Sequence, residues 1–75
     1  MPITTLDLRG VRCPLPIVRL NTTIRTIEPG QQLGFVADDP AFPLDVQAWG
    51  RRTGHAVTLD PPDAGCVRGT VTRVA

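Results

Sequence analysis

The chain has 75 residues, enough for one small domain (residues 1–75), and a net charge of +1 with eight arginines and no lysine. Without lysine, Schiff-base chemistry and a P-loop ammonium are excluded, and the small charge argues against bulk attraction to nucleic acid or a membrane surface. A chain of this length buries only about 60% of its unfolded surface. We therefore expect chemistry at the surface or at an interface rather than in a deep internal cleft.

The cysteine content and the N-terminal residues indicate the cellular compartment and whether a cofactor is expected. Cys13 and Cys66 are too few for a disulfide framework, which favours a reducing, cytoplasmic compartment. The N-terminal residues show no basic segment followed by an apolar run, so no signal peptide is expected, and the apolar stretches are too short to cross a bilayer. Because a structural zinc site needs four ligands, two cysteines and one histidine predict no metal, and no organic cofactor is expected.

The hydrophobic pattern predicts six elements in the order βαβαββ. Strands are expected at residues 3–9, 33–37, 55–59 and 66–74, the second of them central and buried on both faces, and the first helix over residues 14–27. Asp39 is predicted to cap a second helix that ends at Gly54, with Asp38 as a turn residue. Two βα crossovers that join neighbouring parallel strands, followed by a hairpin, give an α+β fold. It is a two-layer sandwich with both helices on one face of a four-stranded mixed sheet.

Cys13 lies where the first strand gives way to the first helix. Pro14 suits the first position of a helix, which would make Cys13 the N-cap at the positive end of the helix dipole. A thiolate is stabilised there, so the pattern predicts a lowered pKa and a nucleophilic Cys13, with Arg9 and Arg12 adding positive charge. Pro16 and Pro14 would stiffen the turn. Cys66 has no such setting and is interpreted as structural.

Several motifs together resemble the TusA/SirA-like sulfur-carrier family. They are LRGVRCPLP at residues 8–16, PG at 29–30, ADDPA at 37–41 and GH at 54–55. The resemblance covers about residues 6–75 and implies a small cytoplasmic protein that carries persulfide sulfur on its motif cysteine. It implies that Cys13 is the carrier, that Pro14 and Pro16 shape its turn, that Arg12 is the adjacent basic residue and that Asp39 belongs to the Asp-Asp-Pro element.

The resemblance also implies partners. Members of the family take sulfur from a cysteine desulfurase or another persulfidated protein and pass it to an acceptor protein, for tRNA thiolation or other sulfur metabolism. Where tRNA-thiolation members carry an acidic residue between the two prolines, this chain has Leu15, which puts that pathway in doubt. Leu15 and Val18 lie on the predicted solvent side of the first helix, so they are candidates for a docking patch.

Two other functions stay open at this point. One is a non-catalytic interaction or regulatory module that docks through the first helix, and the other is a thiol redox protein that uses Cys13 with Cys66 as the resolving thiol. A sulfurtransferase-type carrier would need Cys13 alone, a redox pair would need both cysteines, and a docking module would need neither.

Overall fold

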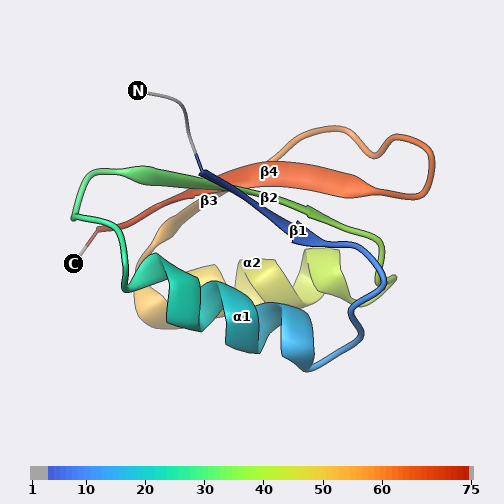
Figure 1. The fold of residues 1–75 in the computed structure, drawn as a ribbon, viewed down its shortest axis with the longest axis horizontal. Helices are drawn as coiled ribbons and strands as arrows, with labels where there is room; N and C mark the ends of the chain where they lie inside the picture. The colour runs from blue at the N-terminus through green and yellow to red at the C-terminus, as the bar shows by residue number, and fades with distance from the viewer. Residues whose placement is uncertain (1–3, 75) are drawn as a thin grey trace.

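Two α-helices cover one face of a four-stranded mixed β-sheet and leave the other face open (Figure 1). The computed structural model describes residues 4–74, so Ile3, expected in the first strand, lies outside the described residues. The elements are β1 (Thr4–Leu8), α1 (Leu15–Ile24), β2 (Gln32–Ala37), α2 (Phe42–Thr53), β3 (Ala56–Leu59) and β4 (Val67–Thr72). The α+β class, the βαβαββ order and the two layers predicted from the sequence are confirmed.

The strands lie in the order β1-β2-β4-β3. β1 pairs with β2 in parallel, whereas β4 pairs antiparallel with both β2 and β3. The prediction that both crossovers join neighbouring parallel strands is therefore right for β1 and β2 but wrong for β2 and β3. The hairpin partner β4 is inserted between β2 and β3, where it gains a hydrogen-bonding partner along each of its edges.

The core lies between the helices and the sheet. Alternation along β2 directs Leu33, Phe35 and Ala37 to one face, and all three are buried. The Phe35 ring meets that of Phe42 from α2 edge-on, with centroids 5.3 Å apart. Trp49 of α2 is buried in the same core. These aromatic contacts fix α2 against the sheet.

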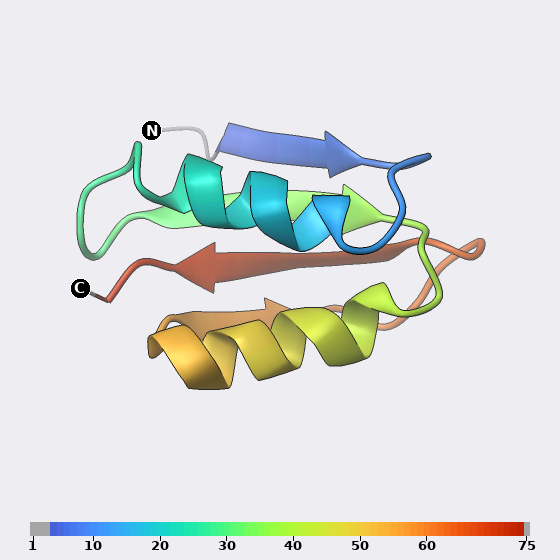
Figure 2. The same ribbon diagram turned by 90° about the horizontal axis from the view of Figure 1, so that it is seen from below.

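The two helices lie side by side beneath the sheet (Figure 2). The indole N–H of Trp49 in α2 donates a hydrogen bond to Asn21 Oδ1 in α1 at 3.2 Å. α2 also approaches β3 closely at the buried Gly50, where an added Cβ would lie 2.7 Å from a methyl carbon of Val57. The position of α2 is thus fixed on both sides.

Some element ends differ from the sequence prediction. α1 ends at Ile24 rather than near residue 27, because the Thr23 carbonyl accepts both the N–H and the hydroxyl of Thr26 and closes a tight turn. α2 ends before Gly54, as predicted, with Gly54 in the left-handed conformation that a helix C-terminus favours. β4 begins at Val67, so Cys66 precedes the strand instead of starting it.

The outer face of the sheet is polar. One cross-strand row holds Thr5, Gly34, Thr70 and Thr58, in the order in which the strands lie. Among the described residues, neither helix has the length and apolar character needed to cross a membrane.

Candidate functional site

Cys13 lies in the segment between β1 and α1, with its side chain exposed. The Cys13–Pro14 peptide bond is cis. Pro14, rather than Cys13, is the N-cap, and its carbonyl accepts the Val18 N–H at 3.2 Å. The predicted helix start was therefore one residue early. Cys13 precedes the helix, so its sulfur is not in the capping position that the sequence suggested.

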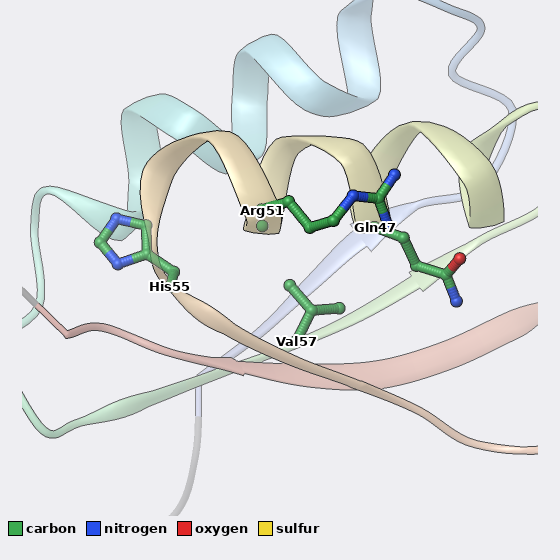
Figure 3. Close-up of a pocket in the computed structure, with 5 residues that line it drawn as sticks. Gln47, Arg51, His55 and Val57 are labelled. Carbon is green, nitrogen blue, oxygen red and sulfur yellow. The ribbon is translucent and has the colours of Figure 1, made fainter.

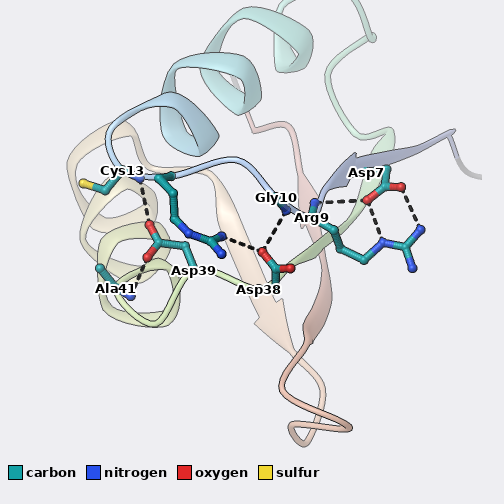
Figure 4. Close-up of polar contacts among 8 residues, drawn as sticks. Asp7, Arg9, Gly10, Cys13, Asp38, Asp39 and Ala41 are labelled. Carbon is teal, nitrogen blue, oxygen red and sulfur yellow. Dashed lines mark hydrogen bonds and ion pairs between the residues drawn. The ribbon is translucent and has the colours of Figure 1, made fainter.

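The segment after β2 holds the backbone of Cys13. Asp39 Oδ2 accepts the Cys13 N–H at 2.8 Å, and Asp39 Oδ1 accepts the N–H of Ala41 at 3.3 Å (Figure 4). Asp39 is 8% exposed, so its carboxylate is largely shielded from water. The N-cap of α2 is Ala41. Asp39 thus joins the start of α2 to the cysteine segment instead of serving as the helix N-cap that the sequence predicted.

This meeting follows from the parallel pairing of β1 and β2. The carboxyl ends of parallel strands lie at the same edge of a sheet, so the segments that follow β1 and β2 emerge side by side (Figure 2). Cys13 comes from the first of these segments and Asp38 and Asp39 come from the second. The sheet topology therefore brings together two motifs that are 26 residues apart.

The two arginines near Cys13 are paired with aspartates. Arg12 Nη1 lies 2.7 Å from Asp38 Oδ1, which also accepts the Gly10 N–H at 2.9 Å. Arg9 makes two side-chain hydrogen bonds to Asp7, at 2.9 and 2.8 Å. Hydrogen bonds from Arg9 lower the pKa of Asp7 to about 2, and those from Gly10 and Arg12 lower the pKa of Asp38. Both guanidinium groups thus face carboxylates.

The pKa of the Cys13 thiol is raised rather than lowered. The largest cause is a hydrogen bond to the Asp45 carboxylate, followed by desolvation and by the negative charges of Asp45 and Asp39. In Figure 4 the sulfur points away from Asp38, the carboxylate with which Arg12 is paired. The prediction of a lowered Cys13 pKa is wrong in direction, because the carboxylates of Asp45 and Asp39 and desolvation disfavour the thiolate.

Asp45 is the residue that sequence reasoning missed. It lies in the first turn of α2, where its N–H donates to the Ala41 carbonyl at 3.0 Å. The sequence did hold a signal, because Asp45 follows Asp39 by six residues and so falls in the first turn of the second helix. That helix begins at the same sheet edge as the cysteine segment. The position of Asp45 in the fold depends on where α2 starts, and the sequence analysis placed the helix N-cap at Asp39 rather than at Ala41.

The remaining site residues predicted from the sequence lie on α1. Pro16 is buried in the first turn of the helix. Leu15 and Val18 are each 52% exposed, as predicted. On α2, Leu44 is 76% exposed and immediately precedes Asp45. Exposed apolar side chains therefore lie on both helices at the end where Cys13 is held.

Cys66 lies in the turn between β3 and β4. Its N–H and carbonyl pair with those of Asp63, and its side chain is partly buried. Cys13 and Cys66 are both free thiols.

An open groove of about 330 Å³ lies between α2 and β3. Gln47, Gly50, Arg51, His55 and Val57 line it (Figure 3), and Cys13 is not among these residues. Across residues 4–74, no group of three or more His, Cys, Asp or Glu side chains is arranged to hold a metal ion.

Comparison with known proteins places this geometry in a family. The model of the family described as sulfurtransferase TusA matches residues 4–73. A protein of Aquifex aeolicus (strain VF5) named "Putative sulfur carrier protein" is 43% identical over 51 residues, which are 68% of this chain and 26% of that protein. The chain thus spans about a quarter of the length of that curated relative.

The fold has a counterpart among solved structures. The crystal structure of a SirA-like protein from Desulfitobacterium hafniense superposes with a TM-score of 0.84 and 20% sequence identity, over 97% of this chain and 100% of the other. At that identity the likeness concerns the fold. The family model covers almost the whole chain, including the cysteine and Asp-Asp-Pro motifs, and we conclude that this chain belongs to the TusA sulfurtransferase family.

Proposed function

We propose that this chain is a sulfur carrier that accepts persulfide sulfur on Cys13 and transfers it to an acceptor protein. The observation that carries the proposal is the exposure of Cys13 within the motif of a sulfurtransferase family. A carrier must meet two partner proteins in turn, and an exposed sulfur on a small domain is accessible to both.

The transfer is an exchange between thiols and persulfides. The Cys13 sulfur attacks the outer sulfur of a donor persulfide, a Cys13–S–S bond forms, and the donor S–S bond breaks with its electron pair on the donor sulfur. The Cys13 thiol gives up its proton and the departing donor thiolate takes one up. The net change is Cys13–SH plus donor–S–S⁻ to Cys13–S–S⁻ plus donor–SH. The second transfer repeats these steps with an acceptor thiol attacking the outer sulfur on Cys13.

The surroundings of Cys13 support this role. The hydrogen bond from the Cys13 N–H to Asp39 fixes the backbone, and the buried Pro16 fixes the helix that follows. The backbone of Cys13 is therefore held while its side chain stays exposed. This combination suits a sulfur that must be presented in one direction.

We propose a cysteine desulfurase or another persulfidated protein as donor, and a thiol-bearing sulfur-relay protein as acceptor, with Leu15 and Val18 in the docking surface. Both side chains are half exposed on α1 close to Cys13 in sequence, and apolar contacts of this kind stabilise transient protein interfaces.

The experiment is an intact-mass measurement after incubation with a cysteine desulfurase and cysteine. The proposal predicts a gain of one sulfur atom that reductant reverses, that persists in Cys66→Ser and that is absent from Cys13→Ser. Loss of the added sulfur in both variants would favour a two-cysteine redox protein. A Cys13 that takes no sulfur from any persulfide donor would contradict the proposal.

A further inference from the structure

The sheet has an unpaired edge at β3. β3 is the last strand in the order β1-β2-β4-β3, and among residues 4–74 only β4 pairs with it. The Asp60 N–H, just after β3, donates to the Arg68 carbonyl of β4 at 2.8 Å. Because residues in an antiparallel pair alternate between facing the partner strand and facing away, the N–H and carbonyl groups of Val57 and Leu59 point toward the open edge. The close approach at Gly69 agrees, since an added Cβ there would lie 3.2 Å from Leu59 Cα, the short spacing of a pair without mutual hydrogen bonds.

The groove of about 330 Å³ between α2 and β3 lies next to this edge. Gln47, Gly50 and Arg51 line it from α2, and Val57 lines it from β3, with His55 just before that strand (Figure 3). A groove between a helix and an unpaired strand is where extended peptides bind by adding a strand to a sheet. Main-chain hydrogen bonds then supply the affinity, and the surrounding side chains select the residues of the peptide.

The walls of the groove are fixed by packing. An added Cβ at Gly50 would lie 2.7 Å from a methyl carbon of Val57, so the strand packs directly on the backbone of the helix. His55 Nδ1 accepts the Val74 N–H at 3.1 Å, and the His55 ring lies 5.5 Å from that of Trp49. The groove is therefore formed before a peptide arrives, which lowers the free-energy cost of binding.

The side chains that line the groove include a cation and no carboxylate. Arg51 is exposed, and its side chain forms no ion pair or hydrogen bond with another described residue. A guanidinium group can bind a carboxylate through two parallel N–H bonds, and the Gln47 amide adds a further donor. An acidic side chain is therefore the complement of this wall.

We propose that this groove binds an extended peptide segment of a partner protein, which pairs with Val57 and Leu59 as a fifth strand and places an acidic side chain against Arg51. The site is separate from Cys13, so the inference goes beyond the sulfur-carrier role. A second copy of the chain fits less well. The sequence of β3 is AVTL, so two copies paired through this strand would offer Arg51 no carboxylate from it.

The experiment measures peptide binding by fluorescence anisotropy. The probe is an octapeptide of alternating valine and glutamate, labelled with fluorescein at its N-terminus and amidated at its C-terminus, and the same peptide with lysine in place of glutamate is the charge-reversed probe. The variant is Arg51→Glu. Arg52→Glu is the matched control, because it reverses the charge of an exposed neighbour that does not line the groove. Amide hydrogen exchange, with and without the glutamate peptide, locates the contact.

We expect the parent and Arg52→Glu to bind the glutamate peptide with similar affinity and Arg51→Glu to bind it several-fold more weakly. Arg51→Glu should in turn gain affinity for the lysine peptide. The amides of Val57 and Leu59 should exchange more slowly when the glutamate peptide is bound, because they then donate hydrogen bonds to it.

Four results would overturn the proposal: no binding by the parent, unchanged binding by folded Arg51→Glu, equal losses in Arg51→Glu and Arg52→Glu, or slowed exchange away from β3. A dimer of the free chain that already protects the Val57 and Leu59 amides would also overturn it, since the edge would then belong to a second copy. Arg51→Gln repeats the test if circular dichroism shows that Arg51→Glu does not fold.

Discussion

The hydrogen bond between Asp39 and Cys13 gives a prediction whose size follows from the structure. Asp39→Ala removes the acceptor, 2.8 Å away, of a partly buried N–H. A buried donor left without a partner costs about 1–3 kcal/mol. The second bond, from the N–H of Ala41, is longer at 3.3 Å and therefore weaker. The first bond therefore accounts for most of the expected loss.

In a domain of this size, each kcal/mol lost from the free energy of unfolding lowers the melting temperature by about 4–8 °C. Asp39→Ala should therefore melt roughly 4–24 °C below the parent protein, as followed by circular dichroism. Asp39→Asn keeps a carbonyl oxygen that can accept the Cys13 N–H, so it should lose less than Asp39→Ala. Asp60→Ala, on an exposed carboxylate, should stay within about 0.5 kcal/mol of the parent.

Two results would refute this reasoning. Equal melting temperatures for Asp39→Ala and Asp60→Ala would show that the bond to Cys13 adds nothing to stability. Equal losses for Asp39→Ala and Asp39→Asn would show that the carboxylate charge matters rather than the hydrogen bond.

Three further predictions concern the core, the β1 ion pair and the docking surface. Gly69→Ala should lose about 1–3 kcal/mol of stability in urea unfolding, because its Cβ would collide with the backbone oxygen of Thr58 in β3. Parent-like stability would refute this close packing. Hydrogen bonds from Arg9 lower the pKa of Asp7 from 3.8 to about 2, so the stabilisation is complete above pH 3.8 and is lost as the pH falls through 2. The stability difference between parent and Asp7→Asn should accordingly vanish at the acid end of a pH series, and a constant difference would count against the ion pair. Leu15→Glu should keep the fold and change the relative rates of sulfur transfer to different acceptors, whereas Val74→Glu, on a similarly exposed residue, should not. Identical rates in both variants would rule out docking through α1.

Local patterns were sufficient to predict the elements of this fold. The glycine after the last turn of α2 correctly predicted the end of the helix. The spacing of Phe42, Val46 and Trp49 is that of one helical face, and the structure buries all three. The strand order was only partly predictable. Insertion of β4 between β2 and β3 depends on pairing between residues far apart in the sequence, and alternation within one strand carries no information about its neighbours.

The candidate site was likewise only partly predictable from the sequence. The exposure of Cys13 and its place before α1 follow from the local motif. The raised Cys13 pKa does not, because its largest cause, Asp45, lies on α2, a separate element of the chain. The dipole of α1 by itself predicts a lowered Cys13 pKa, whereas the Asp45 carboxylate of the neighbouring helix α2 raises this pKa.

The most direct test of the sulfur-carrier role locates the sulfur itself. The chain would be loaded by a cysteine desulfurase with cysteine labelled with heavy sulfur, the free thiols blocked, and the peptides mapped by mass spectrometry before and after addition of an acceptor thiol. The account predicts the label on the Cys13 peptide as a persulfide, followed by its loss to the acceptor. A label on the Cys66 peptide, or a Cys13 that is alkylated but never labelled, would contradict it.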